Sequence, residues 1–206
     1  MSKRIQAKKK LSRKFGVSLW GKANDTFAKR NYKPGQHGKT MLRGRTSDYG
    51  TQLKAKQKMK FYYGNISEKQ FRNLFKAATR IKGDVSENFI GLLESRLDVV
   101  VFRASFVPTI FAARQFVNHK HVKVNGKTVN IPSYRLKIGD LVEVKEKSRN
   151  LTIVVESLQN ADTDVPSYLT LDKDNFAIKL ASQPIFADVP YACPMEPHLI
   201  TEFYSR

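Results

Sequence analysis

The stretch from Leu92 to Val144, LLESRLDVVVFRASFVPTIFAARQFVNHKHVKVNGKTVNIPSYRLKIGDLVEV, decides the fold. Its first part carries apolar residues at helical spacing, and Pro108 ends that helix because proline cannot continue the hydrogen-bond ladder. Thr109 is the expected N-cap of a second helix, which runs through Val117. The stretch therefore predicts two short amphipathic helices in succession.

A β-hairpin is predicted after the second helix. Asn125-Gly126 separates two short runs, and both central residues of a type I′ turn need positive φ, which asparagine and glycine tolerate. The run 141–145 then alternates as a half-buried strand does. Residues 94–157 are therefore predicted to form one module, in which two helices pack on a short β-sheet.

The module places many cations on a small surface, and a phosphate backbone is the kind of partner that needs them. Arg96 has an alternative role, an ion pair with Glu94 or Asp98. For His119 the alternative to a phosphate contact is that it only ends its helix. The expected RNA-binding residues of the module are Arg96, Arg103, Arg114, His119, Lys120, Lys123 and Lys127.

The charge of the chain points to the same class of partner. The net charge is +19, which is typical of polyanion binders and unlike an ordinary enzyme surface. Residues 1–60 hold 18 Lys and Arg against 2 Asp and Glu, whereas residues 161–206 hold 3 against 7. Contacts with RNA are therefore expected from the amino-terminal and central parts of the chain.

Metal, membrane and export functions find little support in the sequence. The single cysteine, Cys193, excludes an internal disulfide and a zinc site with several cysteines, and no cofactor is expected. No apolar run approaches the ~20 residues of a membrane helix. Residues 1–11 are basic but lack the apolar stretch of a secretory signal. The cytoplasm is the expected location, and an organellar transit peptide is the alternative.

Residues 1–45 are predicted to form a basic, extended arm that is irregular unless bound, because apolar residues are sparse and the cations repel one another. Aromatic and apolar side chains would anchor such an arm between RNA helices. The expected anchors are Phe15, Leu19, Trp20 and Phe27, and the expected RNA contacts of the arm are Arg43 and Arg45.

A helix with two distinct sides is predicted before the module. Ser67 and Gln70 form a capping box at its start. At 100° per residue an apolar stripe falls opposite a basic one, so the helix should bury one side and offer the other to phosphates, with a merely solvated face as the alternative. The apolar stripe is Phe71, Leu74, Phe75, Ala78 and Ile81, and the basic stripe is Lys69, Arg72, Lys76 and Arg80, of which Arg72 and Arg80 are expected RNA contacts.

The acidic carboxyl end is expected to avoid RNA. Residues 168–171 are predicted to form a strand, and His198 to Tyr204 a short helix. We expect this end to pack on the first helical block, so that residues 46–93 and 158–206 build one mainly helical domain around the inserted module. The predicted fold class is α+β.

Motifs in the module and outside it carry a family resemblance. The pattern Glu94-x-Arg96-Leu97, Thr109, Ala113-Arg114-x-Phe116-Val117 and Val124-Asn125-Gly126 resembles the small RNA-binding fold shared by ribosomal proteins, pseudouridine synthases and tyrosyl-tRNA synthetases. Further motifs resemble the S-four family of bacterial small-subunit ribosomal proteins, nearly end to end. They are Pro34-Gly35-Gln36-His37-Gly38, Ser47-Asp48-Tyr49-Gly50-x-Gln52-Leu53, Lys56-Gln57-Lys58, Gln70-Phe71-Arg72-Asn73 and His198-Leu199-Ile200-x-Glu202-x-Tyr204-Ser205.

The resemblance implies a structural role on the ribosome. Members of that family bind the 5′ domain of 16S ribosomal RNA, nucleate the body of the 30S particle and support decoding accuracy. The implied partners are ribosomal RNA, the neighbouring protein S-five and messenger RNA near the channel through which it enters. Some members also repress their own operon. No membrane partner and no homo-oligomer are expected.

Two positions depart from the family pattern. The arm lacks the cysteines that hold zinc in many members, so the chain resembles the metal-free form. Ile110 stands where a basic residue commonly follows the capping threonine. One phosphate contact of the family is thus in doubt, and Arg103, Arg114 and Lys123 are expected to contribute more of the electrostatic attraction.

Two other functions could use the same module. An RNA-modifying enzyme needs a pocket and a placed acid or nucleophile. Asp98 and Asp140 sit in module or turn positions, no remaining block is large enough for a catalytic domain, and no catalytic residue is expected. A stress protein that recycles stalled large subunits is the other alternative, and sedimentation with small or large subunits would separate it.

Overall fold

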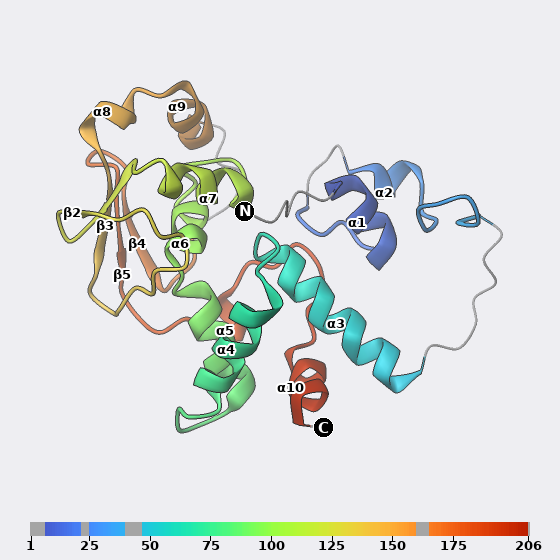
Figure 1. The fold of residues 1–206 in the computed structure, drawn as a ribbon. Coiled ribbons are helices and arrows are strands. Elements are labelled where there is room, and N and C mark those ends of the chain that lie inside the picture. Colours follow the sequence, from blue (N-terminus) through green and yellow to red (C-terminus); the bar gives the residue numbers. More distant parts are fainter. Residues whose placement is uncertain (1–6, 22–24, 40–46, 160–164, 206) are drawn as a thin grey trace. The chain divides into compact units, whose positions relative to one another are not determined.

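The structure is a computed structural model that describes residues 7–21, 25–39, 47–159 and 165–205 (Figure 1). Helices and one five-stranded antiparallel sheet make up the fold, which confirms the predicted α+β class. The chain falls into two compact units, Met1–Glu68 with Pro190–Arg206, and Lys69–Val189.

The helices of the second unit begin and end at recognisable signals. The hydroxyl of Thr109 accepts a 3.0 Å hydrogen bond from the Ala112 amide, which confirms the predicted N-cap. Asp84 caps an earlier helix through the Glu87 amide. The helices are α4 (Glu68–Ala78, of which Glu68 belongs to the first unit), α5 (Val85–Glu94), α6 (Leu97–Arg103), α7 (Ile110–Asn118), α8 (Glu146–Arg149), α9 (Thr152–Gln159) and the 3-10 turn η1 (Phe186–Asp188).

The hairpin and the sheet follow α7. Asn125 and Gly126 have φ of 48° and 77°, so both central turn residues are left-handed, as the sequence predicted. The sheet has the order β2-β1-β3-β5-β4, and neighbouring strands are antiparallel. The strands are β1 (Val122–Val124), β2 (Lys127–Thr128), β3 (Leu141–Val144), β4 (Leu169–Asp172) and β5 (Ala177–Leu180).

Alternate strand residues and the two module helices build the core of this unit. Val142 in β3 pairs with Val124 in β1 and with Ile178 in β5, and all three are buried. Helices α6 and α7 pack on each other and lie beside the sheet in Figure 1. Their buried side chains include Val99, Val100, Val101, Ala113, Phe116 and Val117. This packing holds the exposed sides of α7 and the hairpin in fixed places.

Strands β4 and β5 differ from the expectation for the carboxyl end. The predicted strand near residue 168 does form, but it joins the sheet of the module through β5 instead of packing on the first helical block. Strand β5 pairs with the edge of β3 that β1 leaves unpaired, and it contributes the buried residues Ile178 and Leu180. The sequence predicted β4 alone, and the pairing of β5 with β3, about 35 positions earlier in the chain, leaves no local signal.

The first unit pairs helix α3 (Asp48–Tyr62) with helix α10 (Pro197–Ser205). The rings of Tyr49 and Phe203 lie 5.6 Å apart, and Gln52 donates a 2.9 Å hydrogen bond to Glu202. Ile200 is buried. The predicted short helix near the carboxyl end is therefore confirmed, and it packs on α3.

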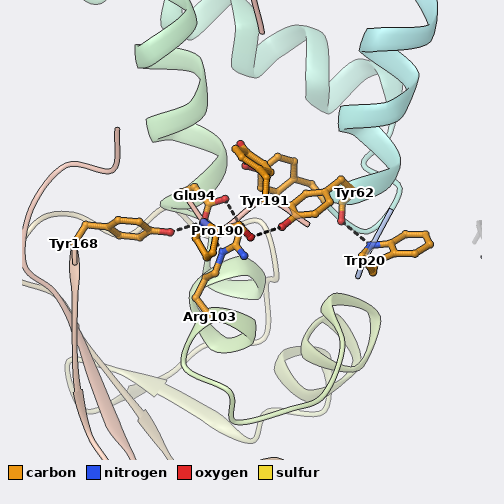
Figure 2. A network of polar contacts seen from close by, with 8 residues as sticks. Trp20, Tyr62, Glu94, Arg103, Tyr168, Pro190 and Tyr191 are labelled. Carbon is orange, nitrogen blue, oxygen red and sulfur yellow. Dashed lines mark hydrogen bonds and ion pairs between the residues drawn. The ribbon is translucent and has the colours of Figure 1, made fainter. Parts of the chain in front are cut away.

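The described part of the arm is not extended throughout, in contrast to the prediction. It contains α1 (Lys8–Phe15) and α2 (Thr26–Lys29), and Leu11 and Leu19 are buried. The indole of Trp20 donates a 3.2 Å hydrogen bond to the Tyr62 carbonyl (Figure 2). The apolar residues expected to anchor the arm on RNA thus partly build a core within the protein, which is why helices form despite the basic composition.

Candidate nucleic-acid interface

The predicted RNA-binding residues fall into three groups by exposure. Arg72, Arg80, His119, Lys120 and Lys127 are exposed, Arg114 and Lys123 are half-buried, and Arg96 and Arg103 are buried. Arg43 and Arg45 lie outside the described residues. Only the first two groups can present a cation to a macromolecule without rearrangement.

Helix α4 presents the basic side that the sequence predicted. Phe71 and Phe75 pack edge-on against Phe89, with ring centroids 5.0 and 5.6 Å apart. Arg72 and Lys76 face solvent at four-residue spacing on this helix, and Arg80, two residues beyond its end, is exposed as well. The burial of one side therefore fixes the direction of the other.

Ile81 is the one member of the predicted apolar stripe that is exposed, at 42%. Helix α4 ends at Ala78, and the Thr79 hydroxyl donates to the Lys76 carbonyl just beyond that end. Because the chain leaves the helix there, the 100° spacing no longer applies and Ile81 turns outward.

The end of α7 and the hairpin expose a second set of cations. Lys120 has φ of 64°, a left-handed residue that ends the helix and directs the chain into β1. His121 stacks on Phe116 at 4.8 Å, and its Nδ1 lies 2.8 Å from the Ser148 hydroxyl. Burial, followed by the positive charges of His119 and Lys145, lowers the pKa of His121 below its ordinary value. Protonation of His121 is thus less favourable than that of an ordinary histidine.

Arg103 lies in a buried polar network with Glu94 and Tyr168 (Figure 2). Its Nε and Nη2 donate to the two oxygens of the Glu94 carboxylate at 3.1 and 2.9 Å. The Tyr168 hydroxyl donates to the same carboxylate at 2.8 Å. This bidentate pair joins the end of α5 to the end of α6, and the tyrosine adds the beginning of β4.

Arg96 forms the second buried pair. Its Nε and Nη2 donate to the two oxygens of the Asp98 carboxylate at 3.0 and 2.8 Å. Arg114 approaches the same carboxylate, with its Nη1 3.7 Å from Oδ2. The ion pair that the sequence left open as an alternative for Arg96 is therefore present, with Asp98 as the partner and not Glu94.

The interior positions of Arg96 and Arg103 have a local reason. The sequence spacing treated them as residues two turns apart on one helix, but α5 ends at Glu94 and α6 begins at Leu97. The chain changes direction at Ser95 and Arg96, so both arginines turn inward toward acids. Glu94 and Asp98, the acids on either side of Arg96, were the sequence signal for these buried ion pairs.

The segment between β2 and β3 presents two exposed cations that the sequence analysis did not name. Arg135 and Lys137 lie between β2 and β3, and the backbone of Arg135 forms a bridge with that of Arg96. The segment is held in place because the Leu97 amide donates to the Tyr134 carbonyl at 2.9 Å. The alternation of Arg135 and Lys137 with Leu136, which is buried, could have identified them.

Other kinds of site find no support among the described residues. No group of three or more His, Cys, Asp or Glu residues in the part of the chain that the structure describes could hold a metal ion. No helix there is long and apolar enough to cross a membrane. What the described surface offers is exposed cations on a folded module, which suits a polyanion.

Comparisons with known proteins agree with this class. Residues 95–142 match the model described as the S4 domain, and residues 3–94 match the model described as the ribosomal protein S4/S9 N-terminal domain. The fold and its cations therefore define a ribosomal protein with an S4-type RNA-binding module.

Relatives of full length name the family. The chain is 58% identical over 206 residues, the whole of both chains, to the small ribosomal subunit protein uS4 of Chelativorans sp. (strain BNC1) and to that of Nitrobacter winogradskyi. It is 57% identical over the same length to the uS4 protein of Brucella abortus (strain S19). The chain belongs to the uS4 family of small ribosomal subunit proteins.

Membership of this family decides between the functions that the sequence left open. The chain is a structural constituent of the small ribosomal subunit and not an enzyme. Its place is the ribosome, in agreement with the predicted cytoplasmic location. The alternative of a protein that recycles large subunits is not supported.

Proposed function

We propose that this protein binds the 5′ domain of 16S ribosomal RNA at a junction of helices, nucleates assembly of the 30S body and supports translational accuracy. The observation that carries the proposal is the exposure of Arg72, Arg80, Lys120 and Lys127 in a chain with a net charge of +19. The family resemblance supplies the particular RNA domain and the role in assembly.

The physical basis is recognition of RNA shape. A-form RNA hides its base edges in a deep, narrow groove, so a folded protein contacts phosphates, 2′-hydroxyls and junction geometry. Cations fixed on helices and turns lose less side-chain freedom on binding than cations on a flexible tail. Each phosphate contact releases counterions, so the affinity should fall steeply with salt.

The proposed contacts combine the predicted residues with the two found on the surface. Arg96 and Arg103 are not among the proposed contacts, because their guanidinium groups pair with buried acids and stabilise the module instead. The proposed RNA-binding residues are Arg43, Arg45, Arg72, Arg80, Arg114, His119, Lys120, Lys123, Lys127, Arg135 and Lys137. The neighbouring protein S-five and messenger RNA are proposed as further partners on the strength of the resemblance alone.

Chemical footprinting tests the proposal. A transcript of the 16S 5′ domain is probed with and without the protein at several salt concentrations, and a large-subunit transcript of equal length serves as the control. We expect protections confined to the 5′ domain that disappear as salt rises. Equal protection of both transcripts, or none on the 5′ domain at low salt, would contradict the proposal.

Single substitutions test the contact list. Lys127→Ala on the exposed hairpin should lower the slope of log affinity against log salt by about one, the share of one phosphate contact. Glu156→Ala, which removes an exposed acid on α9, is the matched surface control and should leave that slope unchanged. Identical slopes for wild type and Lys127→Ala would remove Lys127 from the interface.

A further inference from the structure

Asp98 holds two arginines that come from different parts of the module. Arg96 precedes α6 and takes both carboxylate oxygens at 3.0 and 2.8 Å, whereas Arg114 on α7 lies 3.7 Å from Oδ2. The Asp98 side chain is fully buried, that of Arg96 is 2% exposed, and that of Arg114 is 21% exposed. Of the two cations, only Arg114 reaches the surface.

Backbone hydrogen bonds hold the segment that carries the Asp98 carboxylate. The amides of Leu97 and Asp98 donate to the carbonyls of Tyr134 and Pro132 at 2.9 and 3.1 Å, and the Leu136 amide donates to the Ser95 carbonyl at 2.8 Å. These bonds join the start of α6 to the segment before β3. Asp98 therefore has little freedom to follow a moving side chain.

The charges of this group do not cancel. Two guanidinium groups share one carboxylate, so the group keeps a net positive charge. Arg96 takes the bidentate geometry that best compensates its own burial. Of the two guanidinium groups beside this carboxylate, that of Arg114 lies where the group meets solvent.

We propose that Asp98 is a positioning residue for RNA binding, which holds the Arg114 guanidinium at the surface of α7 in the orientation that a phosphate requires. The inference rests on the proposed function, because it assumes that Arg114 contacts RNA. A free arginine side chain has many accessible rotamers, and part of that freedom is lost when it binds. Tethering by a buried carboxylate removes part of that loss before RNA arrives.

Net charge alone predicts the opposite sign. Asp98→Asn removes a negative charge beside the interface, so a purely electrostatic surface would bind RNA more tightly. If Asp98 positions Arg114, the same change weakens binding, because Arg114 loses its anchor. The direction of the effect therefore separates the two explanations.

A double-mutant cycle tests the inference. Affinity for the 16S 5′ domain transcript is measured for wild type, Asp98→Asn, Arg114→Gln and the double variant, each corrected for its folded fraction. We expect Asp98→Asn to weaken binding about tenfold in the wild-type background, a common size of coupling between residues in contact, and to have no effect beside Arg114→Gln. Equal effects in both backgrounds, or tighter binding by Asp98→Asn, would overturn the inference.

A matched control accounts for lost stability. Tyr168→Phe removes a hydrogen bond in the same unit to the buried carboxylate of Glu94, the acid that pairs with Arg103. Its folded fraction should bind RNA as wild type does. An affinity loss in Tyr168→Phe as large as that in Asp98→Asn would show that destabilisation alone explains both, and the inference would fail.

A measurement on the unmodified chain serves if Asp98→Asn does not fold. NMR of arginine Nε–Hε groups reports their mobility, and Arg114→Lys identifies the Arg114 signal by its loss. We expect Arg114 to be nearly as ordered as Arg96 and much more ordered than the exposed Arg72. Equal mobility of Arg114 and Arg72 would refute the tether.

The inference and the proposed function can fail separately. If wild-type protein protects no nucleotide of the 5′ domain, the proposed function fails. If wild-type protein binds the transcript and Arg114→Gln binds equally well, the function stands and the role of Asp98 is refuted.

Discussion

The hydroxyl of Tyr168 donates a 2.8 Å hydrogen bond to the Glu94 carboxylate, 74 residues earlier in the chain, and both groups are buried. Glu94 ends α5, and Tyr168 immediately precedes β4. This bond joins the strands from the carboxyl-terminal part of the chain to the helices of the RNA-binding module.

Tyr168→Phe should therefore destabilise the second unit by about 1.5–3 kcal/mol, the range for hydrogen bonds to charged groups. Native-state hydrogen exchange at the Val142 and Val144 amides of β3 measures the change. Tyr204→Phe is the control, because its hydroxyl bonds Glu68, whose side chain is 48% exposed and can turn to water. A wild-type exchange profile for Tyr168→Phe would show that the bond contributes nothing.

Substitution of a buried and of an exposed arginine from the predicted site should have different effects, the first on stability and the second on RNA binding. Arg103→Met removes the cation that pairs with the buried Glu94 carboxylate, so the free energy of unfolding should fall by about 3–5 kcal/mol. Arg72→Ala changes an exposed side chain, so stability should stay within about 0.5 kcal/mol while affinity for RNA falls. Urea unfolding and RNA titration of both variants check this. If Arg103→Met is as stable as wild type, the stabilising role of the Arg103–Glu94 pair is refuted.

Gly126→Val should destabilise the hairpin through the backbone alone. Gly126 has φ of 77°, and a Cβ added there would meet no heavy atom within 4 Å, so space is not the obstacle. A left-handed backbone costs an ordinary residue about 1–2 kcal/mol, and a β-branched one resists it most. Thermal unfolding measures the loss, and Gly126→Asn should lose less, because asparagine tolerates this conformation. Equal losses would contradict the turn assignment.

The lowered pKa of His121 predicts a pH dependence of stability. Because folding lowers this pKa, the unfolded chain binds the proton more readily, and stability rises with pH between the folded and unfolded values. Stability should therefore fall as the pH drops from about 6.5, the unfolded value, and level off below the folded one. Urea unfolding of wild type and His121→Gln from pH 8 to pH 5 isolates this contribution as the difference between them. If the unfolding free energies of the two proteins changed in parallel with pH, a contribution from His121 would be excluded.

Local signals in the sequence predicted the parts of the fold that depend on local chemistry. Asn125-Gly126 specified its turn because few other residues adopt two left-handed conformations in succession. Thr109 specified its cap because its hydroxyl reaches an amide three residues ahead. The exposed cations Arg72 and Lys76 followed from the helical period, since α4 is continuous through them, whereas Arg80 lies beyond the end of the helix.

The remaining features depend on where the chain turns and on partners far along it. Helical spacing placed Arg96 and Arg103 outward, but the break between α5 and α6 directs both to buried acids. Composition predicted an extended arm, because its cations far outnumber its apolar residues. The burial of Leu11 and Leu19 depends on tertiary packing, which the sequence does not show. The pairing of β5 with β3 joins residues about 35 positions apart, and the register is set by which apolar faces meet in the core.

Strand β3 is paired along both of its sides, by β1 from the hairpin and by β5 from the region after α9. A chain truncated before Ala177 would keep the module helices and the hairpin but would leave one side of β3 as an open edge. Unpaired backbone amides and carbonyls on an apolar strand are a template for a strand of another molecule. In the complete sheet β5 occupies this side of β3, so the backbone groups that such a truncation would leave open are paired within the chain itself.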